Sequence, residues 1–227
     1  MAGRLIRRLL RPAVYRAEAM LDRLRGVRRA PEEVFGEIHD ARSWGGASVS
    51  GGGSDPETTA ALLEALPPLL TAIGVRTILD APCGDGNWMA TLDYRFEHYT
   101  GIDVVPAVIE AATEAHGGPG REYRVGDLIR DPLPQADLVL CRDCLVHLPF
   151  AEGLEALSNI RRSGATWLLA TTFPARESNA DIRMGRWRPL NLCRPPYSLP
   201  EPEQLVNERF AADPRFADKS LGLWRLK

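Results

Sequence analysis

The stretch ILDAPCGDGNWM, residues 78–89, decides the fold that we expect for this chain. It begins as an apolar run, reaches an acid at Asp80, and breaks into small residues around Gly84 and Gly86 before Trp88. Glycine lets the backbone approach a ligand closely and permits a positive φ. In an open α/β sheet, ligands bind outside the carboxyl ends of the strands. We therefore expect a buried strand, a tight ligand-binding turn and the start of a helix.

Strand-like and helix-like segments alternate on both sides of this stretch. Apolar runs at 75–81, 99–105, 121–125, 136–141 and 165–173 predict strands, and helices are expected at 56–73, 84–92, 106–117 and 150–164. Such alternation predicts an α/β fold with a mostly parallel sheet and helices on both faces. Two closing runs, 204–210 and 220–227, predict an antiparallel edge.

Charge is distributed unevenly along the chain. The net charge is −2, but residues 1–30 hold nine arginines against Glu18 and Asp22, a balance of +7 that leaves −9 for the remainder. An acidic main body argues against nucleic acid as a partner. Apolar residues at helical spacing within 4–25 predict an arginine-rich helix. That helix either meets an anionic membrane or a partner, or packs on its own domain or on the second subunit of a homodimer.

The four cysteines and the lengths of the apolar runs indicate the cellular compartment in which we expect the protein. The cysteines lie mostly in or beside strand-like runs, not in the framework of a small disulfide-rich domain, and no secretory apolar segment is evident. No apolar run approaches the ~18 residues that a membrane-spanning helix needs. We therefore expect a reduced, cytoplasmic protein without a membrane span.

The acid Asp80 narrows the choice of ligand. Three residues after Gly86 stands Met89, so the glycine spacing departs from the dinucleotide fingerprint, and an acid at the start of the turn would repel a pyrophosphate. The same acid would attract a cationic or amine-bearing ligand. Asp103, at the end of the second strand, can accept hydrogen bonds from both hydroxyls of a ribose. The ligand is thus expected to be a nucleoside with a cationic group.

These motifs, in this order, resemble those of the class I S-adenosylmethionine-dependent methyltransferases. The family's first motif is an acid followed by alternating glycines, and here it runs from Asp80 to Gly86, with Pro82 in place of the first glycine. The resemblance continues through Asp103 as the ribose acid and through Asp127, in VGDLI, at the adenine amino group. It reaches the fourth strand and the catalytic edge in ADLVLCRDCLVHL, residues 136–148.

The resemblance implies a Rossmann-like methyltransferase fold with S-adenosyl-L-methionine as cofactor. It places the fold in residues 41–227, after an arginine-rich helical extension in residues 1–40. Several segments, among them SVSGGGS (48–54), CRDCLVHLPF (141–150) and DKSLGLWRLK (218–227), also resemble a bacterial subgroup associated with polysaccharide and natural-product gene clusters. The residues expected at the cofactor are Asp80, Pro82, Cys83, Gly84, Gly86, Trp88, Asp103, Val104, Asp127, Leu128 and Arg142.

The catalytic candidates follow the fourth strand. Methyl transfer from a sulfonium needs alignment of the nucleophile and, for a hydroxyl, removal of its proton. His147 is the preferred base because its ordinary pKa lies near neutrality, and Asp143 could orient it or the substrate. If a helical turn begins at Asp143, the two side chains face the same way. The alternative is that His147 packs or caps the chain before Pro149.

A metal is not expected at this edge. Cys141, Cys144 and His147 form C-x₂-C-x₂-H, which is a zinc-like spacing, but no second pair of ligands has a suitable spacing. Small buried thiols explain these cysteines better than zinc or redox chemistry does.

Two further segments are candidates for contact with the acceptor. The Gly/Ser-rich segment 41–55 is either a linker or a lid that places Trp44 over a ligand. The loop after the fifth strand combines polar groups with an aromatic face, as a sugar requires, or else is pinned by its own Arg–Asp pairs. Its candidate residues are Asn179, Asp181, Arg186, Trp187 and Arg188.

The sequence therefore predicts a methyltransferase that acts on a hydroxyl, with an amine as second choice, of a small, polar, sugar-containing metabolite or natural product. Two other classes stay open. One is a peptide or protein methyltransferase recruited through the N-terminal helix, and the other is a non-catalytic module that binds a nucleoside.

Overall fold

The computed structural model describes residues 29–45, 50–210 and 213–227. The predicted arginine-rich helix within 4–25 lies outside the described residues. The first described element is α2, Pro31–Asp40, which belongs to the predicted N-terminal extension. The helix begins at a proline in its first turn, with Glu32 and Glu33 next to it. Proline and acidic residues both favour a helix start.

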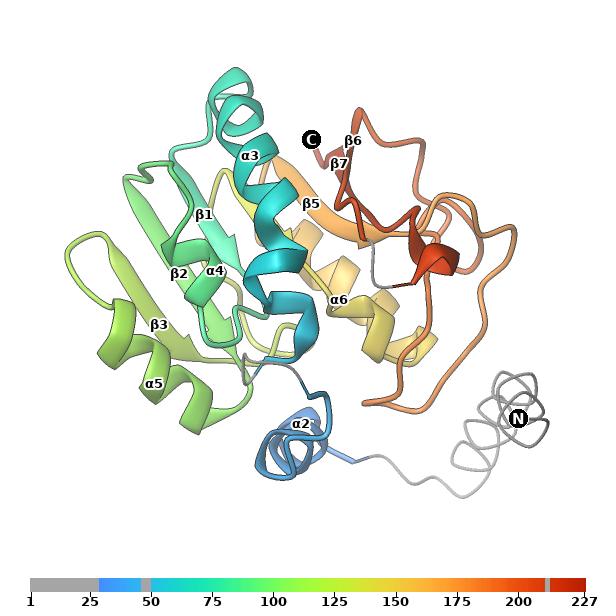
Figure 1. Ribbon diagram of the computed structural model, residues 1–227, viewed down its shortest axis with the longest axis horizontal. Coiled ribbons are helices and arrows are strands. Elements are labelled where there is room, and N and C mark those ends of the chain that lie inside the picture. Colours follow the sequence, from blue (N-terminus) through green and yellow to red (C-terminus); the bar gives the residue numbers. More distant parts are fainter. Residues whose placement is uncertain (1–28, 46–49, 211–212) are drawn as a thin grey trace.

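Seven strands form one sheet in the order β3-β2-β1-β4-β5-β7-β6 (Figure 1). The first five are parallel to their neighbours, whereas β7 runs antiparallel to both β5 and β6. The predicted antiparallel edge is therefore confirmed. The strands are β1 Thr77–Asp80, β2 His98–Asp103, β3 Arg121–Val125, β4 Leu138–Cys141, β5 Trp167–Thr172, β6 Gln204–Asn207 and β7 Ser220–Arg225.

Helices cover both faces of the sheet, and alternate residues of each central strand point to opposite cores. Leu79 and Val139 belong to the core that contains residues of α6, while Ile78 and Leu138 belong to the core that contains residues of α3, α4 and α5. A strand buried on both faces is apolar along its whole length, as these are. The helices are α3 Pro56–Ala72, α4 Asn87–Ala90, α5 Pro106–His116 and α6 Phe150–Arg162.

The α/β fold expected from the sequence is confirmed, and most observed elements are shorter than the predicted runs. The region 174–202, where no helix was expected, has neither helix nor strand. The six prolines of this region, and the hydrogen bonds of its polar side chains described below, explain why it forms an irregular loop.

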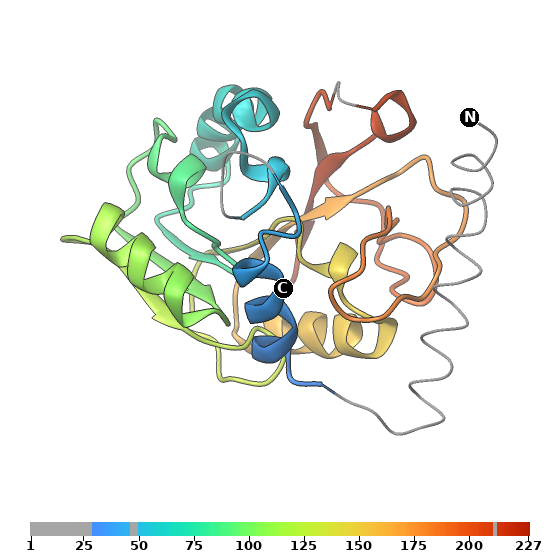
Figure 2. The ribbon, with the colours of Figure 1, turned by 60° about the horizontal axis from the view of Figure 1, so that its bottom comes forward.

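Helix α2 lies apart from the two helical layers, at the end of the sheet where the parallel strands terminate (Figures 1 and 2). Phe35 and His39 of α2 line the same pocket as Asp80 and Asp103, which end β1 and β2. This arrangement brings the segment before the sheet onto the carboxyl edge. In the part of the chain that the structure describes, no helix has the length and apolar character that a membrane crossing requires.

Candidate active site

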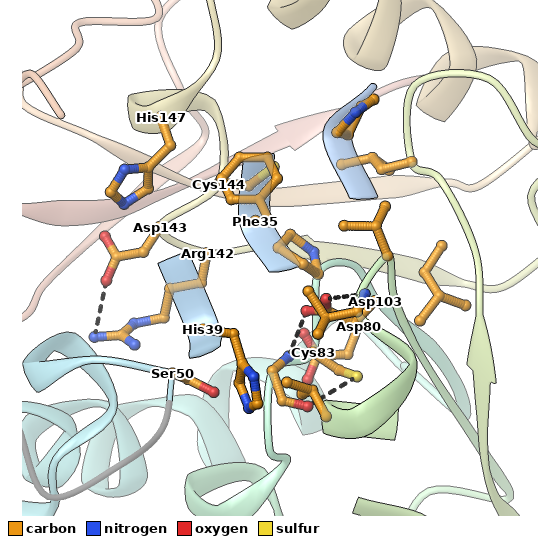
Figure 3. A pocket seen from close by; sticks show the side chains of 18 of the residues that line it. Phe35, His39, Ser50, Asp80, Cys83, Asp103, Arg142, Asp143, Cys144 and His147 are labelled. Atoms are coloured by element: carbon orange, nitrogen blue, oxygen red, sulfur yellow. Dashed lines mark hydrogen bonds and ion pairs between the residues drawn. The ribbon is translucent and has the colours of Figure 1, made fainter. Parts of the chain in front are cut away.

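A single continuous pocket opens at the carboxyl ends of β1, β2 and β4 (Figure 3). Its floor includes Asp80 and Asp103 from the strand ends, and its far side includes Arg142, Asp143 and His147 from the segment after β4. Parallel strands place their carboxyl ends at one edge, and the crossing order β2-β1-β4 leaves a crevice there. The topology therefore gathers residues that are far apart in sequence, such as Asp80 and His147, into one cavity.

Asp80 is a buried carboxylate with one side-chain partner. Its side chain lies at the end of β1 in a residue that is only 2% exposed, and the Tyr99 hydroxyl donates a 2.7 Å hydrogen bond to its Oδ2. Burial raises the pKa of Asp80 to about 7, although the bond from Tyr99 and the charges of Arg142 and Arg121 act in the opposite direction. A cation placed against Asp80 would favour its charged form.

The turn after β1 depends on its glycines. Gly84 and Gly86 have φ of 54° and 68°, in the left-handed region that side chains disfavour. A Cβ at Gly84 would lie 2.3 Å from Oγ of Ser50, so the chain before α3 rests directly on this turn. The same Ser50 Oγ accepts a 2.8 Å hydrogen bond from the backbone N–H of Asp85. The bond between Ala81 and Pro82 is cis.

Asp103 braces the cofactor turn from the neighbouring strand. Its Oδ2 accepts a 3.2 Å hydrogen bond from the N–H of Gly84, and its Oδ1 accepts a 3.0 Å bond from the N–H of Val105. Burial raises the pKa of Asp103, and these backbone donors oppose the rise. Each carboxylate oxygen has more than one lone pair, so both can still accept bonds from hydroxyl groups.

Most residues predicted to contact the cofactor line this pocket. The exception is Gly86, which caps α4 and faces Tyr123 instead. Asp127 also has protein partners, because its Oδ1 accepts from the N–H of Ile129 and its Oδ2 from Arg130. The predicted residues in the lining are Asp80, Pro82, Cys83, Gly84, Trp88, Asp103, Val104, Asp127, Leu128 and Arg142.

No helical turn begins at Asp143, although Asp143 and His147 do share the pocket. Asp143 has a φ of 50°, outside helical geometry, and its N–H donates a 2.8 Å bond to Oγ1 of Thr171 on β5. A 3₁₀ turn begins only at Leu145 and ends at His147. The hydrogen bond to Thr171 therefore holds Asp143 against the end of β5, two residues before the 3₁₀ turn begins.

His147 lies under an aromatic cover. Its ring centroid is 4.8 Å from that of Trp44, which in turn is 5.9 Å from the ring of Phe35 on α2. Its Nδ1 is 3.1 Å from the carbonyl oxygen of Arg186. Burial lowers the pKa of His147 to about 4, and the charge of Asp143 counteracts part of this effect. The imidazole is therefore neutral at pH 7, with Nδ1 donating to that carbonyl and Nε2 left as the acceptor.

Of the six residues predicted to bind the acceptor, Trp44 lines the pocket and the other five lie outside its lining. Asn179 instead donates to the carbonyl oxygens of Asn191, Arg194 and Pro195. Asp181 accepts a 2.8 Å bond from the N–H of Phe150, the first residue of α6. These polar groups hold the loop and a helix end, and their contact with an acceptor stays a prediction.

Arg188 and its neighbours shape the site from behind. The Arg188 side chain is buried and donates to the carbonyl oxygens of Leu145 and Leu148, which flank the turn that carries His147. Trp187 packs edge-on against Phe173 and Phe216. Hydrogen bonds and ring contacts with the rest of the protein thus hold this part of the loop.

Sequence reasoning missed several residues of the site. Phe35, His39 and Ser50 line the pocket from before the predicted domain core, and Lys219 contacts Asp143 from just before β7. Only the glycine- and serine-rich composition around Ser50 signalled a role, as a lid. In residues 29–45, 50–210 and 213–227, no group of three or more His, Cys, Asp or Glu side chains is arranged to hold a metal ion.

Comparison with known proteins points to one family. The methyltransferase domain profile matches residues 78–164, which include the turn after β1 and the edge after β4. The chain is 29% identical over 140 residues to a ubiquinone biosynthesis O-methyltransferase of Xylella fastidiosa, a match that covers 55% of this chain and 56% of that protein. It is 30% identical over 99 residues to the malonyl-[acyl-carrier protein] O-methyltransferase of Serratia marcescens, covering 41% of this chain and 37% of that one.

The chain thus spans about half the length, or less, of these curated relatives. A solved structure with the same fold is magnesium protoporphyrin IX methyltransferase from Synechocystis PCC 6803 with bound S-adenosylmethionine, at a TM-score of 0.50 and 16% identity, covering 68% of this chain and 82% of that one. The ordered motifs, their convergence on one pocket and the matching domain profile agree. Residues 78–164 therefore match a methyltransferase domain, and the motifs gathered at the pocket resemble those of the class I S-adenosylmethionine-dependent methyltransferases.

Proposed function

We propose that this protein transfers a methyl group from S-adenosylmethionine to a hydroxyl of a small, neutral, polar acceptor. One observation carries the proposal: the buried carboxylates Asp80 and Asp103 share a pocket with a neutral imidazole, His147. The carboxylates suit a cationic nucleoside, and the imidazole suits a group that must lose a proton.

The residues present fit the cofactor at both of its ends. Asp80 would hold the cationic methionine end, because burial has raised its pKa to about 7 and a nearby positive charge would relieve that cost. Asp103 would accept bonds from the ribose hydroxyls, and Asp127 and Leu128 would lie at the adenine. When bound, the cofactor supplies an activated methyl group on its sulfonium.

The charges of the pocket favour a neutral acceptor over a carboxylate or phosphate. Among the described residues that line the pocket, Arg142 is the one Lys or Arg, and its guanidinium already donates a 2.6 Å bond to Glu208 and a 2.7 Å bond to the carbonyl of Gly53. An anionic acceptor would therefore meet Asp80, Asp103 and Asp143 without a cation of its own. A hydroxylated molecule, such as one containing a sugar, avoids this repulsion.

His147 would act as the base. With Nδ1 facing the Arg186 carbonyl, Nε2 can accept the proton of the acceptor hydroxyl as its oxygen attacks the methyl group. The depressed pKa of His147 keeps the imidazole unprotonated at neutral pH, but it also makes this imidazole a weaker base than an exposed histidine. Trp44 and Phe35 would cover the reacting groups and exclude water. The O-methyltransferase names of two relatives are consistent with an oxygen atom as acceptor.

The test is a mass-spectrometric screen for the gain of one methyl group. The purified protein is incubated with S-adenosylmethionine and two matched panels, neutral hydroxylated molecules and their carboxylated counterparts. Methylation confined to the neutral panel supports the proposal. Methylation confined to the carboxylated panel overturns the choice of acceptor, and cofactor binding without methylation of any acceptor supports the non-catalytic alternative.

Two variants then separate binding from chemistry. Asp103→Ala should abolish cofactor binding in calorimetry, because the ribose would lose its acceptor and Gly84 its brace. His147→Gln should keep the cofactor affinity and lower turnover about 10²–10⁴-fold, the range of a lost general base. Unchanged binding in the first variant, or unchanged turnover in the second, contradicts the corresponding assignment.

A further inference from the structure

Four charged side chains meet beneath the catalytic edge of the pocket. Arg142 and Asp143 come from the segment after β4, Glu208 directly follows β6, and Lys219 directly precedes β7. We call these four residues the charge cluster. The side chains of Arg142, Glu208 and Lys219 are 4%, 0% and 7% exposed, so three of the four charges are removed from water.

The contacts form a closed chain of ion pairs. Lys219 Nζ lies 2.6 Å from Oδ2 of Asp143 and 3.2 Å from Oε2 of Glu208. Arg142 lies 2.6 Å from that same Oε2, and 3.6 Å from Oδ2 of Asp143. Each cation therefore touches both acids, and two positive charges balance two negative ones.

The backbone fixes the position of the lysine. The N–H of Glu208 donates a 2.9 Å bond to the carbonyl oxygen of Lys219, which ties the two ends of the β6–β7 hairpin together. Arg142 also reaches the carbonyl of Gly53, in the segment before α3. The charge cluster thus joins the C-terminal hairpin, the catalytic edge and the chain that covers the pocket.

Burying the charges of this cluster costs free energy of desolvation. Burying ion pairs costs desolvation energy that apolar side chains of similar size would avoid, so a buried pair is weak evidence for a stabilising role. The cluster is better explained by the fixed positions that it gives to its side chains. One oxygen of Asp143, Oδ2, is held by Lys219, whereas Oδ1 has no hydrogen-bond partner among the described residues.

Asp143 lies between Arg142 and His147 in the pocket (Figure 3). Its negative charge favours the protonated form of His147, while Lys219 and Arg188 oppose that form. A base that gains a proton during the reaction becomes an imidazolium, and a fixed carboxylate nearby stabilises it. The placement of Asp143 therefore matters to the proton transfer.

Resting on the function proposed above, we propose that Lys219 is a positioning residue: supported by Glu208, it holds the Asp143 carboxylate beside His147. In the reaction, the acceptor oxygen forms a bond to the methyl carbon, and the carbon–sulfur bond breaks with its electron pair left on sulfur. The hydroxyl proton goes to His147. Lys219 exchanges neither a proton nor a bond, and acts only through Asp143.

A double-mutant cycle tests this action through Asp143. Lys219→Met and Asp143→Asn should each lower kcat about 10–100-fold, and the combined variant should fall no further than either one. The dissociation constant of S-adenosylmethionine should change less than about threefold in all three. The proposal is overturned if the fold-losses in kcat of the two single variants multiply in the double variant, or if Lys219→Met leaves kcat unchanged. It is also overturned if the affinity for S-adenosylmethionine falls as much as kcat does.

Two controls address folding. Lys219→Arg keeps the charge and should restore most of the lost kcat. Lys219→Met/Glu208→Gln removes one charge of each sign, leaves Arg142 and Asp143 as a balanced pair, and serves if Lys219→Met alone does not fold. In that variant too, kcat should fall about 10–100-fold, and wild-type turnover overturns the proposal.

A crystal structure of Lys219→Met, or of the balanced variant, keeps the test independent of methyl transfer. The Asp143 side chain should be displaced from its place beside His147. An unmoved carboxylate overturns the positioning role even if an acceptor has been found. A wild-type protein that methylates no acceptor, but shows this displacement in the variant, overturns the proposed function and leaves the positioning of Asp143 intact.

Discussion

Tyr99 donates its hydroxyl hydrogen to Oδ2 of Asp80 at 2.7 Å, across two neighbouring strands of the sheet. Both residues are almost completely buried, at 1% and 2% exposed. Arg121 lies over the Tyr99 ring, with its guanidinium carbon 4.4 Å from the centroid. The charged form of Asp80 thus depends on one neutral donor and on cations that do not touch it, which leaves room for a cationic ligand.

The affinity for S-adenosylmethionine should fall as the pH falls below about 7. Burial raises the pKa of Asp80 to about 7 in the free protein, and a bound cation would lower it. Binding below pH 7 therefore releases a proton, which weakens affinity by up to about tenfold per pH unit. Calorimetry across this range checks the slope. The Asp80→Asn variant should bind S-adenosylmethionine weakly, with an affinity that does not change with pH. A wild-type affinity independent of pH contradicts the prediction.

The raised pKa of Asp80 should also make the stability of the cofactor-free protein depend on pH. Because the pKa of this carboxyl group is higher in the folded protein than the ordinary value of 3.8, the folded state binds the proton more tightly. Its contribution to stability is present below about pH 4 and is lost as the pH rises through 7. Asp80→Asn should therefore remove this loss, so that the melting temperature of the cofactor-free variant declines less between these pH values than that of the wild type.

Tyr99→Phe should weaken cofactor binding about tenfold at pH 7.5, because Asp80 would lose the hydrogen bond from the Tyr99 hydroxyl while staying buried. Tyr94→Phe is the matched control, since Tyr94 also donates one hydrogen bond, to the carbonyl of Val75, but lies outside the lining of the pocket. Equal affinities of the two variants would show that Tyr99 does not act on the cofactor site.

Gly53→Ala should lower turnover with little loss of stability. A Cβ at Gly53 would lie 2.7 Å from Oδ2 of Asp143, the oxygen that Lys219 holds, so the carboxylate must shift. Gly36→Ala in α2 is the control, because no atom lies within 4 Å of its Cβ position and alanine favours a helix. Steady-state kinetics check the pair, and equal turnover would show that Asp143 tolerates displacement.

Arg188→Met should destabilise the protein. Arg188 donates to the carbonyl oxygens of Leu145 and Leu148 inside the protein, and unsatisfied buried carbonyls cost about 1–3 kcal/mol each. The melting temperature should fall on the order of 5–15 °C. Arg194→Met changes an exposed arginine of the same loop and should leave it nearly unchanged. A drop of the same size in both variants contradicts the role of Arg188 as a buried brace.

The turn after β1 and the acids at the strand ends could be predicted because each depends on a few neighbouring residues in the sequence. An apolar run that ends at Asp80 and turns through Gly84 predicts an acid at the end of a strand, and Asp103 follows by the same rule at β2. The loop after β5 was harder. Its polar residues read as ligands for a sugar, but Asn179 and Arg188 bind backbone carbonyls of the protein itself. A sequence does not show whether a polar group's partner is internal.

The sequence by itself determined the order of strands and helices, the cofactor turn and the position of His147 after β4, because hydrophobic periodicity and glycine placement act over a few residues. Only the tertiary structure decided what surrounds these groups. Ser50 meets the turn at Asp85, and Lys219 meets Asp143, through contacts between residues far apart in the chain. Such contacts depend on how the sheet orders its strands, and that order places the β6–β7 hairpin beside the catalytic edge.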